Sequence, residues 1–474
     1  MNKKIDVIKN IYLKNYMIFT LLISTFFFIL SCFWTPFMMF AWAVLGATFV
    51  FSNIQEILCY IIYFIMFSRN TIFFVGVAVI GFIVILVKYV KDLINKRVKT
   101  YKDPLIATIG LCIIFSLISY GLTFQGVCQG LLFIGLLFLI YLLFCYRDKI
   151  NVEQCFNFLF FGIMASALTC LLLYFIPNAK ITFYEVNSFT FRSIRELIFL
   201  SDQSYKRLML LSYHPNHLAS YCMYIAAFVV HYIINNKMKG NEKKFFCYFL
   251  MLGIVTVLGI LTISKAFLII IAIIALYGFV FFVIKYKKES LKLILPAFIV
   301  VLILCLCFHK VLISIFERFF NTTSGSILNI ITSGRTDIWK AYTNDIFSSP
   351  WKVLFGKGIF ATEVIAIGPH NIYIEVLFRV GIVGYIGLGV ICYLYIISCD
   401  KKIKFSMSKC LSLIIFLVHS IQEANFDERF LFLILAIMLL FNKNYDMIDS
   451  EKNIFKNVRH SGRRYSKKKK YRKW

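Results

Sequence analysis

Residues 126–145 read GVCQGLLFIGLLFLIYLLFC, a predominantly apolar run without a charged side chain. A helix needs about 20 such residues to cross the hydrocarbon core of a bilayer. Similar runs recur along the 474 residues of the chain, which are 60% hydrophobic and only 16% charged. This balance excludes a soluble domain of the same size. The sequence therefore predicts an all-α, polytopic integral membrane protein.

The apolar runs predict about 12 to 14 transmembrane helices, several of them short for a complete span. The candidate spans are approximately residues 16–33, 36–51, 54–67, 71–88, 104–122, 126–145, 155–176, 214–234, 245–262, 264–284, 292–309, 371–397, 408–420 and 427–441. Together they predict one membrane domain over residues 1–442, which is followed by a basic tail over residues 443–474.

The positive charge of the chain follows the positive-inside pattern. The formal net charge is +28, but Lys and Arg mostly form short clusters between apolar runs, which argues against a nucleic-acid partner. If the basic N-terminus is cytoplasmic, every strongly basic short connection falls on the cytoplasmic side. These connections are residues 88–102, 147–149, 237–244, 285–292 and 401–409. We therefore expect both termini in the cytoplasm, with the tail against anionic membrane lipids.

The sequence contains no motif for a cofactor or a metal. Its 14 cysteines include no CxxC pair, and most lie within apolar runs, where a thiol behaves as a small apolar side chain. There is no Gly-rich nucleotide loop and no aspartate-rich outer loop. His214 and His217 could share a metal, but no third ligand accompanies them. We therefore expect neither a cofactor nor a metal.

Two long connections, residues 177–213 and 310–370, are predicted to lie outside the membrane. The first contains several cations that could attract an anion at the outer leaflet, although solvated surface charge is the alternative. These cations include Arg192, Arg195 and Arg207. The connection leads into Pro215-Asn216-His217, where the proline suits the first turn of a helix. Polar residues at the mouth of a span are costly unless they face water or one another.

The second connection contains a predicted surface helix over residues 336–347. Its apolar side chains follow one stripe at helical spacing, which predicts an amphipathic helix lying on the membrane surface. The stripe consists of Ile338, Tyr342 and Ile346, with Trp339 beside it. Arg335 precedes the helix, where the helix dipole already favours an anion. A guanidinium there suits a phosphate or diphosphate, and an interfacial arginine that reaches for water is the alternative.

Charged residues also surround the start of the span at 371–397. Gly356-Lys357-Gly358 predicts a flexible turn that carries a cation, and Lys265 lies at another predicted outer turn. Glu375 and Arg379 are four residues apart on one helical face, so they can pair. The polar outer face of the protein is therefore rich in cations.

His370, directly before Asn371, is the one well-placed titratable base of this outer face. Histidine changes its charge near neutral pH, so it can take a proton from a hydroxyl group. Cations around a diphosphate stabilise the negative charge that develops as it leaves. This combination predicts transfer of a group from a phosphate-linked donor in the membrane.

These segments resemble the O-antigen ligase/polymerase family of bacterial envelope proteins. The most specific part is His370-Asn371, followed by nine residues, Gly381, two residues and Gly384. The resemblance covers residues 207–220 and 333–384, within a core of about residues 207–397. Gly334-Arg335, Trp339 and the Gly-Lys-Gly turn are similar to the lead-in of the family, and Pro215-Asn216-His217-Leu218-Ala219 is similar to its upstream motif.

Two departures from the family pattern concern the cations. Lys265 stands where the family often has an arginine, so the charge is kept but the bidentate fork is lost. Arg207 is followed by Leu208-Met209-Leu210-Leu211, where the family usually has a glycine before Pro-Asn.

The resemblance implies transfer or polymerisation of sugars carried on undecaprenyl diphosphate, without a metal, at the outer face of the bacterial plasma (inner) membrane. It implies that His370 is the catalytic residue, either as the base or to orient the acceptor hydroxyl. Arg335, Arg207 and Lys265 would hold the diphosphate. The supporting candidates are Arg192, Arg195, Asn216, His217, Trp339, Lys357, Asn371 and Glu375.

We therefore expect a polysaccharide polymerase of O-antigen, capsule or exopolysaccharide biosynthesis, acting as a metal-independent, inverting glycosyltransferase. Its donor and acceptor would be oligosaccharides on undecaprenyl diphosphate, and its partners would be a flippase and a chain-length regulator. One alternative is a ligase that attaches finished glycan to a lipid or protein acceptor. Another is a transporter of lipid-linked oligosaccharide, which the position of the charges at the outer edge, rather than at the bilayer midplane, argues against.

Overall fold

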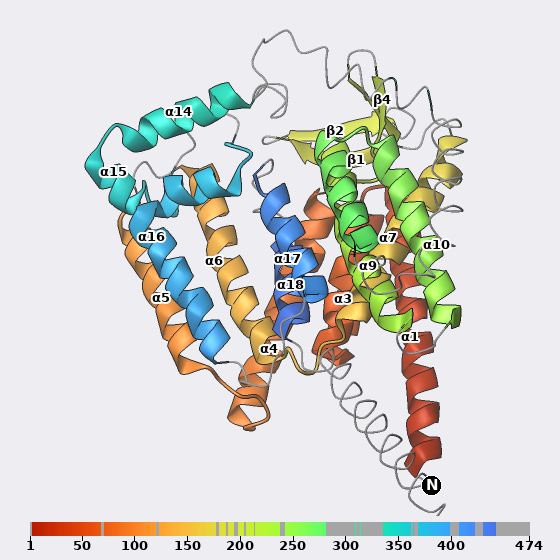
Figure 1. The fold of residues 1–474 in the computed structure, drawn as a ribbon. Coiled ribbons are helices and arrows are strands. Elements are labelled where there is room, and N and C mark those ends of the chain that lie inside the picture. Colours follow the sequence, from red (N-terminus) through yellow and green to blue (C-terminus); the bar gives the residue numbers. More distant parts are fainter. Residues whose placement is uncertain are drawn as a thin grey trace, which may run out of the picture.

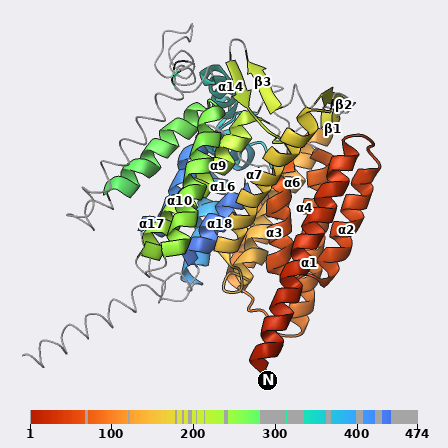
Figure 2. The ribbon, with the colours of Figure 1, turned by 90° about the vertical axis from the view of Figure 1, so that its right-hand side faces the viewer.

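The computed structural model is a bundle of helices that run between two ends (Figures 1 and 2). It describes residues 2–67, 71–119, 123–176, 180–185, 188–193, 198–202, 205–212, 214–237, 242–280, 309, 313, 335–361, 364, 368–398, 407–421 and 430–441. The predicted span 292–309 (except residue 309), the predicted tail 443–474 and Arg195 lie outside these residues. The predicted all-α class is confirmed for the bundle itself.

The helices follow the predicted spans closely. They are α1 (Asn2–Ser31), α2 (Phe37–Phe51), α3 (Ile54–Phe64, extended by a 3-10 turn over Ile65–Phe67), α4 (Thr71–Ile94), α5 (Lys102–Leu117), α6 (Phe124–Cys145), α7 (Val152–Tyr174), α9 (Pro215–Lys237), α10 (Glu242–Leu261), α14 (Thr336–Phe347), α15 (Pro350–Phe355), α16 (Ile372–Ile397), α17 (Met407–His419) and α18 (Phe430–Phe441). A further apolar helix covers Lys265–Val280.

Within the described residues, four helices are long and apolar enough to cross a membrane. They cover Gly126–Cys145, Val152–Tyr174, Lys243–Leu261 and Ile372–Ile397. Shorter apolar helices cover Tyr16–Ser31, Phe37–Phe51, Ile54–Phe67, Lys265–Val280 and Lys409–His419. Each coincides with a predicted span, because a helix satisfies the backbone polar groups of an apolar run within the run itself.

The predicted outer connection 177–213 contains two β-hairpins, which the all-α prediction missed. Strand β1 (Lys180–Glu185) pairs antiparallel with β2 (Ser188–Ser193), and β3 (Phe199–Asp202) pairs with β4 (Tyr205–Leu208). Their Phe, Tyr and Thr residues favour a pleated backbone. Strands of six and four residues are too short for a periodic pattern to stand out in the sequence.

The two ends of the bundle differ in what they carry. The end with the β-strands and α14 is the upper end of Figure 1, and the start of α1 lies at the lower end. At the lower end, the Lys149 ammonium donates to the carbonyl oxygen of Arg97 at 3.4 Å, and the Tyr146 hydroxyl donates to the Asp92 carboxylate at 3.0 Å. Two basic connections that the charge pattern assigns to one side therefore share one end of the bundle.

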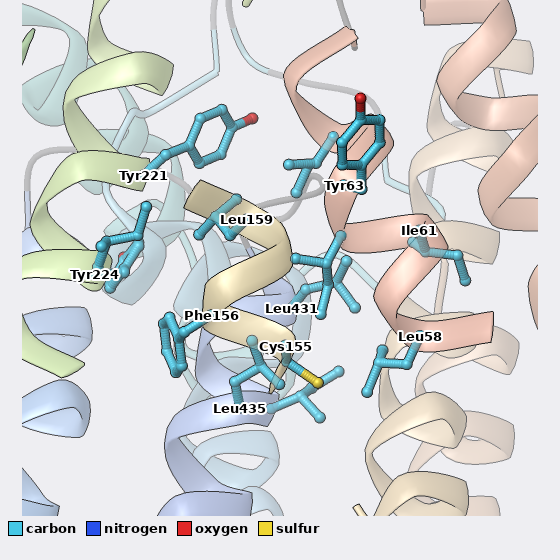
Figure 3. Packing of buried hydrophobic residues seen from close by; sticks show 14 of the residues in the cluster. Leu58, Ile61, Tyr63, Cys155, Phe156, Leu159, Tyr221, Tyr224, Leu431 and Leu435 are labelled. Carbon is cyan, nitrogen blue, oxygen red and sulfur yellow. The ribbon is translucent and has the colours of Figure 1, made fainter. Parts of the chain in front are cut away.

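The core is built around α7, which lies between α3, α9 and α18 (Figure 3). Phe156 of α7 stacks on Phe228 of α9, with ring centroids 4.3 Å apart. A Cβ atom at Gly162 would lie 2.4 Å from the carbonyl oxygen of Tyr63, so glycine lets α7 approach the end of α3 closely. Small residues serve such close helix contacts in membrane proteins.

Helix α16, which coincides with the predicted span 371–397, is kinked at Gly381. Gly381 has φ 59° and ψ −168°, a conformation that residues with a Cβ rarely adopt. The kink frees the carbonyl oxygens of Phe378 and Arg379, which accept the backbone N–H groups of Lys357 and Gly358, each at 2.8 Å. The predicted Gly-Lys-Gly turn is therefore held against the kink by backbone hydrogen bonds.

Candidate functional site

The upper end brings together the starts of α9 and α16, the end of α17 and the turn that follows α10. Arg207, on β4, joins the turn that follows α10 to the start of α9 and is only 2% exposed. Its Nε donates to the carbonyl oxygen of Thr262 at 2.9 Å, and its Nη2 donates to Oδ1 of Asn216 at 2.8 Å. The guanidinium thus connects the hairpin, the turn after α10 and the first turn of α9.

Lys265 begins its helix three residues after Thr262 and is also buried. The Arg207 bond to Thr262 therefore brings two predicted diphosphate-binding cations to one turn. Positive charges in buried surroundings favour a nearby anion, because electrostatic interactions are stronger there than in water. We call Arg207, Asn216 and Lys265 the cation group.

The start of α9 is capped by a histidine rather than by a small polar residue. Nδ1 of His214 accepts the backbone N–H of Asn216 at 3.2 Å, and Pro215 occupies the first helical position, as predicted. The rings of His214 and His217 are 6.4 Å apart between centroids. Across the described part of the chain, no three His, Cys, Asp or Glu side chains gather as a metal site would need.

The start of α16 carries the predicted catalytic residue. His370 has φ 48°, and Asn371 caps the helix by accepting the backbone N–H groups of Tyr373 and Ile374 at 2.9 and 3.2 Å. Asn371 therefore has a structural role as well as a place in the predicted motif. The backbone N–H of Ile372, the first residue of α16, donates to the carbonyl oxygen of Ser420 at 2.9 Å.

Helix α14 has the predicted bounds, but its apolar stripe faces the protein instead of a membrane surface. Tyr342 and Ile346 are almost completely buried, and the Tyr342 ring packs edge-on against Phe378 of α16 at 5.2 Å. The predicted lipid-facing stripe was wrong because α15, α16 and Ala361 cover it. Sequence periodicity shows that a stripe is buried, but it does not say against what.

Trp339 fixes α14 to the start of α16. Its indole N–H donates to the carbonyl oxygen of Pro369 at 2.8 Å. Arg335 lies one turn earlier, and its carbonyl oxygen accepts the backbone N–H of Trp339 at 2.9 Å. Residues four apart lie on the same face of a helix, so Arg335 and Trp339 share the face that meets the residue before His370. We call Arg335, Trp339 and His370 the histidine group.

Lys357 is held beneath α14. Its ammonium lies 3.1 Å from an Asp345 carboxylate oxygen, and Lys352 binds the other oxygen at 2.9 Å. Burial raises the pKa of the Asp345 carboxyl, but hydrogen bonds from the two lysines outweigh it, so the pKa lies below its ordinary value of 3.8. Lys357, a predicted supporting residue, therefore helps to attach α14 and α15 to the turn at residues 356–358.

Glu375 and Arg379 form the ion pair that their spacing predicts. Arg379 Nε lies 2.6 Å from Glu375 Oε1, and both side chains are buried. Nη1 of Arg379 also donates to the carbonyl oxygen of Ile359 at 2.7 Å. Glu375, a predicted supporting residue, is thus engaged in holding the kinked helix to the loop that precedes it.

The backbone around the two groups is unusual. Among the described residues other than glycine, only Lys96, Leu210, Ile263 and His370 have positive φ. Leu210 follows Arg207 by three residues, and Ile263 precedes Lys265 by two. His370 is the predicted catalytic residue. Leu210 occupies this conformation within the segment where the family pattern has a glycine. Strained backbone of this kind clusters at functional sites.

Residues that the sequence analysis missed connect the two groups. His419, at the end of α17, lies 3.1 Å from the Ser220 hydroxyl and 3.3 Å from the Tyr224 hydroxyl, both on α9. Ser420 accepts the N–H of Ile372 at the start of α16. The sequence could have indicated them, because a histidine and a serine stand at the end of an apolar run, and polar residues within a span are usually functional.

The side chains of two further predicted cations, Arg192 and Arg195, lie outside what the structure describes. Arg192 lies on β2, opposite Ile181 in the other hairpin from Arg207. Arg195 lies outside the described residues. The structure therefore links Arg207 to Asn216 and to the turn before Lys265, and links Trp339, one turn after Arg335, to the residue before His370. The end of α17 joins the starts of α9 and α16.

No family model matches the chain, no curated protein is found similar to it, and no solved structure matches it.

Proposed function

We propose that this protein is a polysaccharide polymerase that transfers a glycan from undecaprenyl diphosphate to the sugar hydroxyl of a lipid-linked repeat unit. The observation that carries the proposal is that the cation group and the histidine group lie at one end of an apolar helix bundle, where the end of α17 links the starts of α9 and α16. Its cations suit a diphosphate, and its histidine suits a hydroxyl. The resemblance of residues 207–220 and 333–384 to O-antigen ligases and polymerases supports the same assignment.

The proposed orientation places the lower end in the cytoplasm of a bacterium and the upper end at the outer face of the plasma membrane. The support is the basic connections at the lower end, which the positive-inside rule assigns to the cytoplasm. With this orientation, the site meets lipid-linked sugars that a flippase has delivered. A chain-length regulator would act on the same face.

In the proposed reaction, the acceptor hydroxyl attacks the anomeric carbon of the donor glycan. A new glycosidic C–O bond forms, and the bond between the anomeric carbon and the diphosphate oxygen breaks. Undecaprenyl diphosphate leaves with the electron pair of that bond, and His370 accepts the hydroxyl proton or orients the hydroxyl. Arg207, Lys265 and Arg335 stabilise the charge on the departing diphosphate. A single displacement inverts the anomeric configuration.

The test is polymerisation by the purified full-length protein in lipid nanodiscs, with a defined undecaprenyl-diphosphate repeat unit as donor and acceptor. The wild type should give a ladder of lipid-linked polymer. His370→Ala should abolish the ladder, and so should His370→Asn, which tolerates the left-handed backbone at this position better than alanine does. Gly389→Ala is the control, since a Cβ there meets nothing within 4 Å.

The outcomes separate the proposed function from its alternatives. A full ladder from both His370 variants would contradict the catalytic assignment. Transfer of one preformed glycan to a different lipid or peptide acceptor, without a ladder, would indicate a ligase. Movement of the intact lipid-linked sugar across vesicles, without a new glycosidic bond, would indicate a transporter.

A further inference from the structure

We propose that His419 is a positioning residue for this reaction, and that its neutral imidazole sets how the starts of α9 and α16 face each other. The inference rests on the proposed function, because it gives a role to a side chain that lies behind the same site. It concerns a residue that neither the sequence motif nor the reaction scheme uses.

The position of His419 is central to the upper end. The side chain is only 1% exposed, and both ring nitrogens face α9, at Ser220 and Tyr224. The following residue, Ser420, accepts the backbone N–H of Ile372 at 2.9 Å. The last residue of α17 therefore holds α9 through its side chain, and the residue after it holds α16 through the backbone.

Counting hydrogen-bond donors assigns the proton of the imidazole. The Ser220 hydroxyl lies 2.7 Å from the carbonyl oxygen of Asn216, which can only accept, so the single hydroxyl proton points there. The Ser220 oxygen must then accept from Nε2–H of His419. In a neutral ring, Nδ1 is left as an acceptor for the Tyr224 hydroxyl. The neutral form also suits the position, since the His419 side chain is only 1% exposed and burying a charge is costly.

The resulting chain of hydrogen bonds runs in one direction toward the cation group. Tyr224 donates to His419, His419 donates to Ser220, and Ser220 donates to the carbonyl of Asn216. The Asn216 side chain in turn accepts from Arg207. A change at His419 is thus expected to move the first turn of α9, which binds Arg207 through Asn216, relative to the start of α16, which His370 precedes.

This geometry indicates positioning rather than proton transfer. Both ring nitrogens are directed at protein hydroxyl groups in a buried location, so the ring does not contact a sugar or a diphosphate. Its effect on the reaction comes from alignment. A misplacement of about 1 Å between reacting groups can lower a rate on the order of 10²-fold, with little change in substrate binding.

The first readout does not depend on activity. Solid-state NMR of the full-length protein, with 15N-labelled histidine and in lipid nanodiscs, reports the protonation of each ring. The chain has seven histidines, so the His419 signals can be assigned by their loss in His419→Gln. We expect a neutral ring with its proton on Nε2 at pH 7. A ring protonated on Nδ1, or on both nitrogens, would overturn the hydrogen-bond chain.

The second readout is the polymerisation rate per molecule of folded, monodisperse protein. His419→Gln keeps an N–H donor for Ser220, and we expect its kcat within about threefold of the wild type. His419→Phe keeps the volume but removes both bonds, and we expect kcat to fall at least about tenfold with KM for the repeat unit nearly unchanged. Tyr224→Phe, which removes only one bond, should fall between them and remains informative if His419→Phe does not fold.

The matched control is His231→Phe, which replaces a buried histidine of α9 that lies far along the helix from its first turn. It should retain the wild-type kcat per folded molecule. Equal kcat for the wild type, His419→Phe and Tyr224→Phe would overturn the positioning role, and so would an equal loss in His231→Phe. A wild type that makes no polymer would instead overturn the proposed function, and the NMR readout would still test the hydrogen-bond chain.

Discussion

The indole N–H of Trp339 donates to the carbonyl oxygen of Pro369 at 2.8 Å, so α14 is anchored to the residue directly before His370. Arg335 precedes Trp339 by one helical turn. This single bond therefore relates the position of a predicted diphosphate-binding cation to that of the predicted catalytic histidine, although the two are separated by more than thirty residues of chain.

The first prediction concerns this bond. Trp339→Phe keeps an aromatic ring at the contact but removes the donor, and a neutral hydrogen bond contributes about 0.5–1.5 kcal/mol. We expect the protein to remain folded and polymerisation to fall several-fold, because Arg335 is no longer held in register with His370. Thermal unfolding and polymer yield, measured on the same preparation, would check this. A large loss of stability with normal specific activity would contradict it.

A second prediction separates structure from chemistry at Glu375 and Arg379. Removing one partner of a buried ion pair leaves an uncompensated charge, which costs about 3–5 kcal/mol. Glu375→Gln should therefore lower the melting temperature of the purified protein markedly. The double variant Glu375→Gln/Arg379→Met removes both charges and should recover much of that loss. An unchanged melting temperature in Glu375→Gln would show that the pair does not support α16.

The third prediction tests the kink of α16. A Cβ at Gly381 would lie 2.4 Å from the carbonyl oxygen of Leu354, and the backbone conformation there, which is almost exclusive to glycine, adds about 1–3 kcal/mol of strain for alanine. Gly381→Ala should therefore reduce both the folded yield and the activity. Gly389→Ala lies further along the same helix in open space and should be neutral or stabilising by up to about 1 kcal/mol. Similar behaviour of the two variants would exclude a special role for the kink.

Acid should weaken the attachment of α14 and α15 through Asp345. Because its pKa is lowered in the folded protein, its two lysine bonds contribute stability above the ordinary pKa of 3.8. This contribution is lost as the pH falls through the lowered value. Wild type and Asp345→Asn should thus differ in melting temperature at neutral pH and converge in strong acid. The exposed Asp337, replaced by Asn, is the control on the same helix; a pH-independent difference for Asp345→Asn would contradict the linkage.

The last prediction compares the cations of the upper end. Arg207 uses two separate nitrogens for Thr262 and Asn216, which a lysine cannot reproduce. We therefore expect Arg207→Lys to lose most polymerisation, whereas Lys265→Arg, which keeps the charge, should retain activity. Arg335→Lys should retain more activity than Arg335→Ala. Equal activity of Arg207→Lys and the wild type would remove Arg207 from the proposed site.

The amphipathic helix over residues 336–347 shows what a local sequence pattern can predict and what it cannot. Its bounds and its apolar stripe were predicted, because helical periodicity is a property of neighbouring residues. Its partner was predicted wrongly, since a buried stripe can face lipid or protein. The β-hairpins were missed for a related reason: four-residue strands carry little pattern, and their pairing depends on the turn between them.

The sequence by itself determined that this is an apolar helix bundle in which the basic connections 88–102 and 147–149 share one end, because hydropathy and charge act on each segment independently. It also determined the ion pair of Glu375 and Arg379, which one helical turn brings together. Only the tertiary structure decided that Arg207 meets the turn before Lys265, and that His419 reaches Ser220 across 199 residues of chain. Such contacts depend on which helices pack side by side, and no local pattern of residues specifies that.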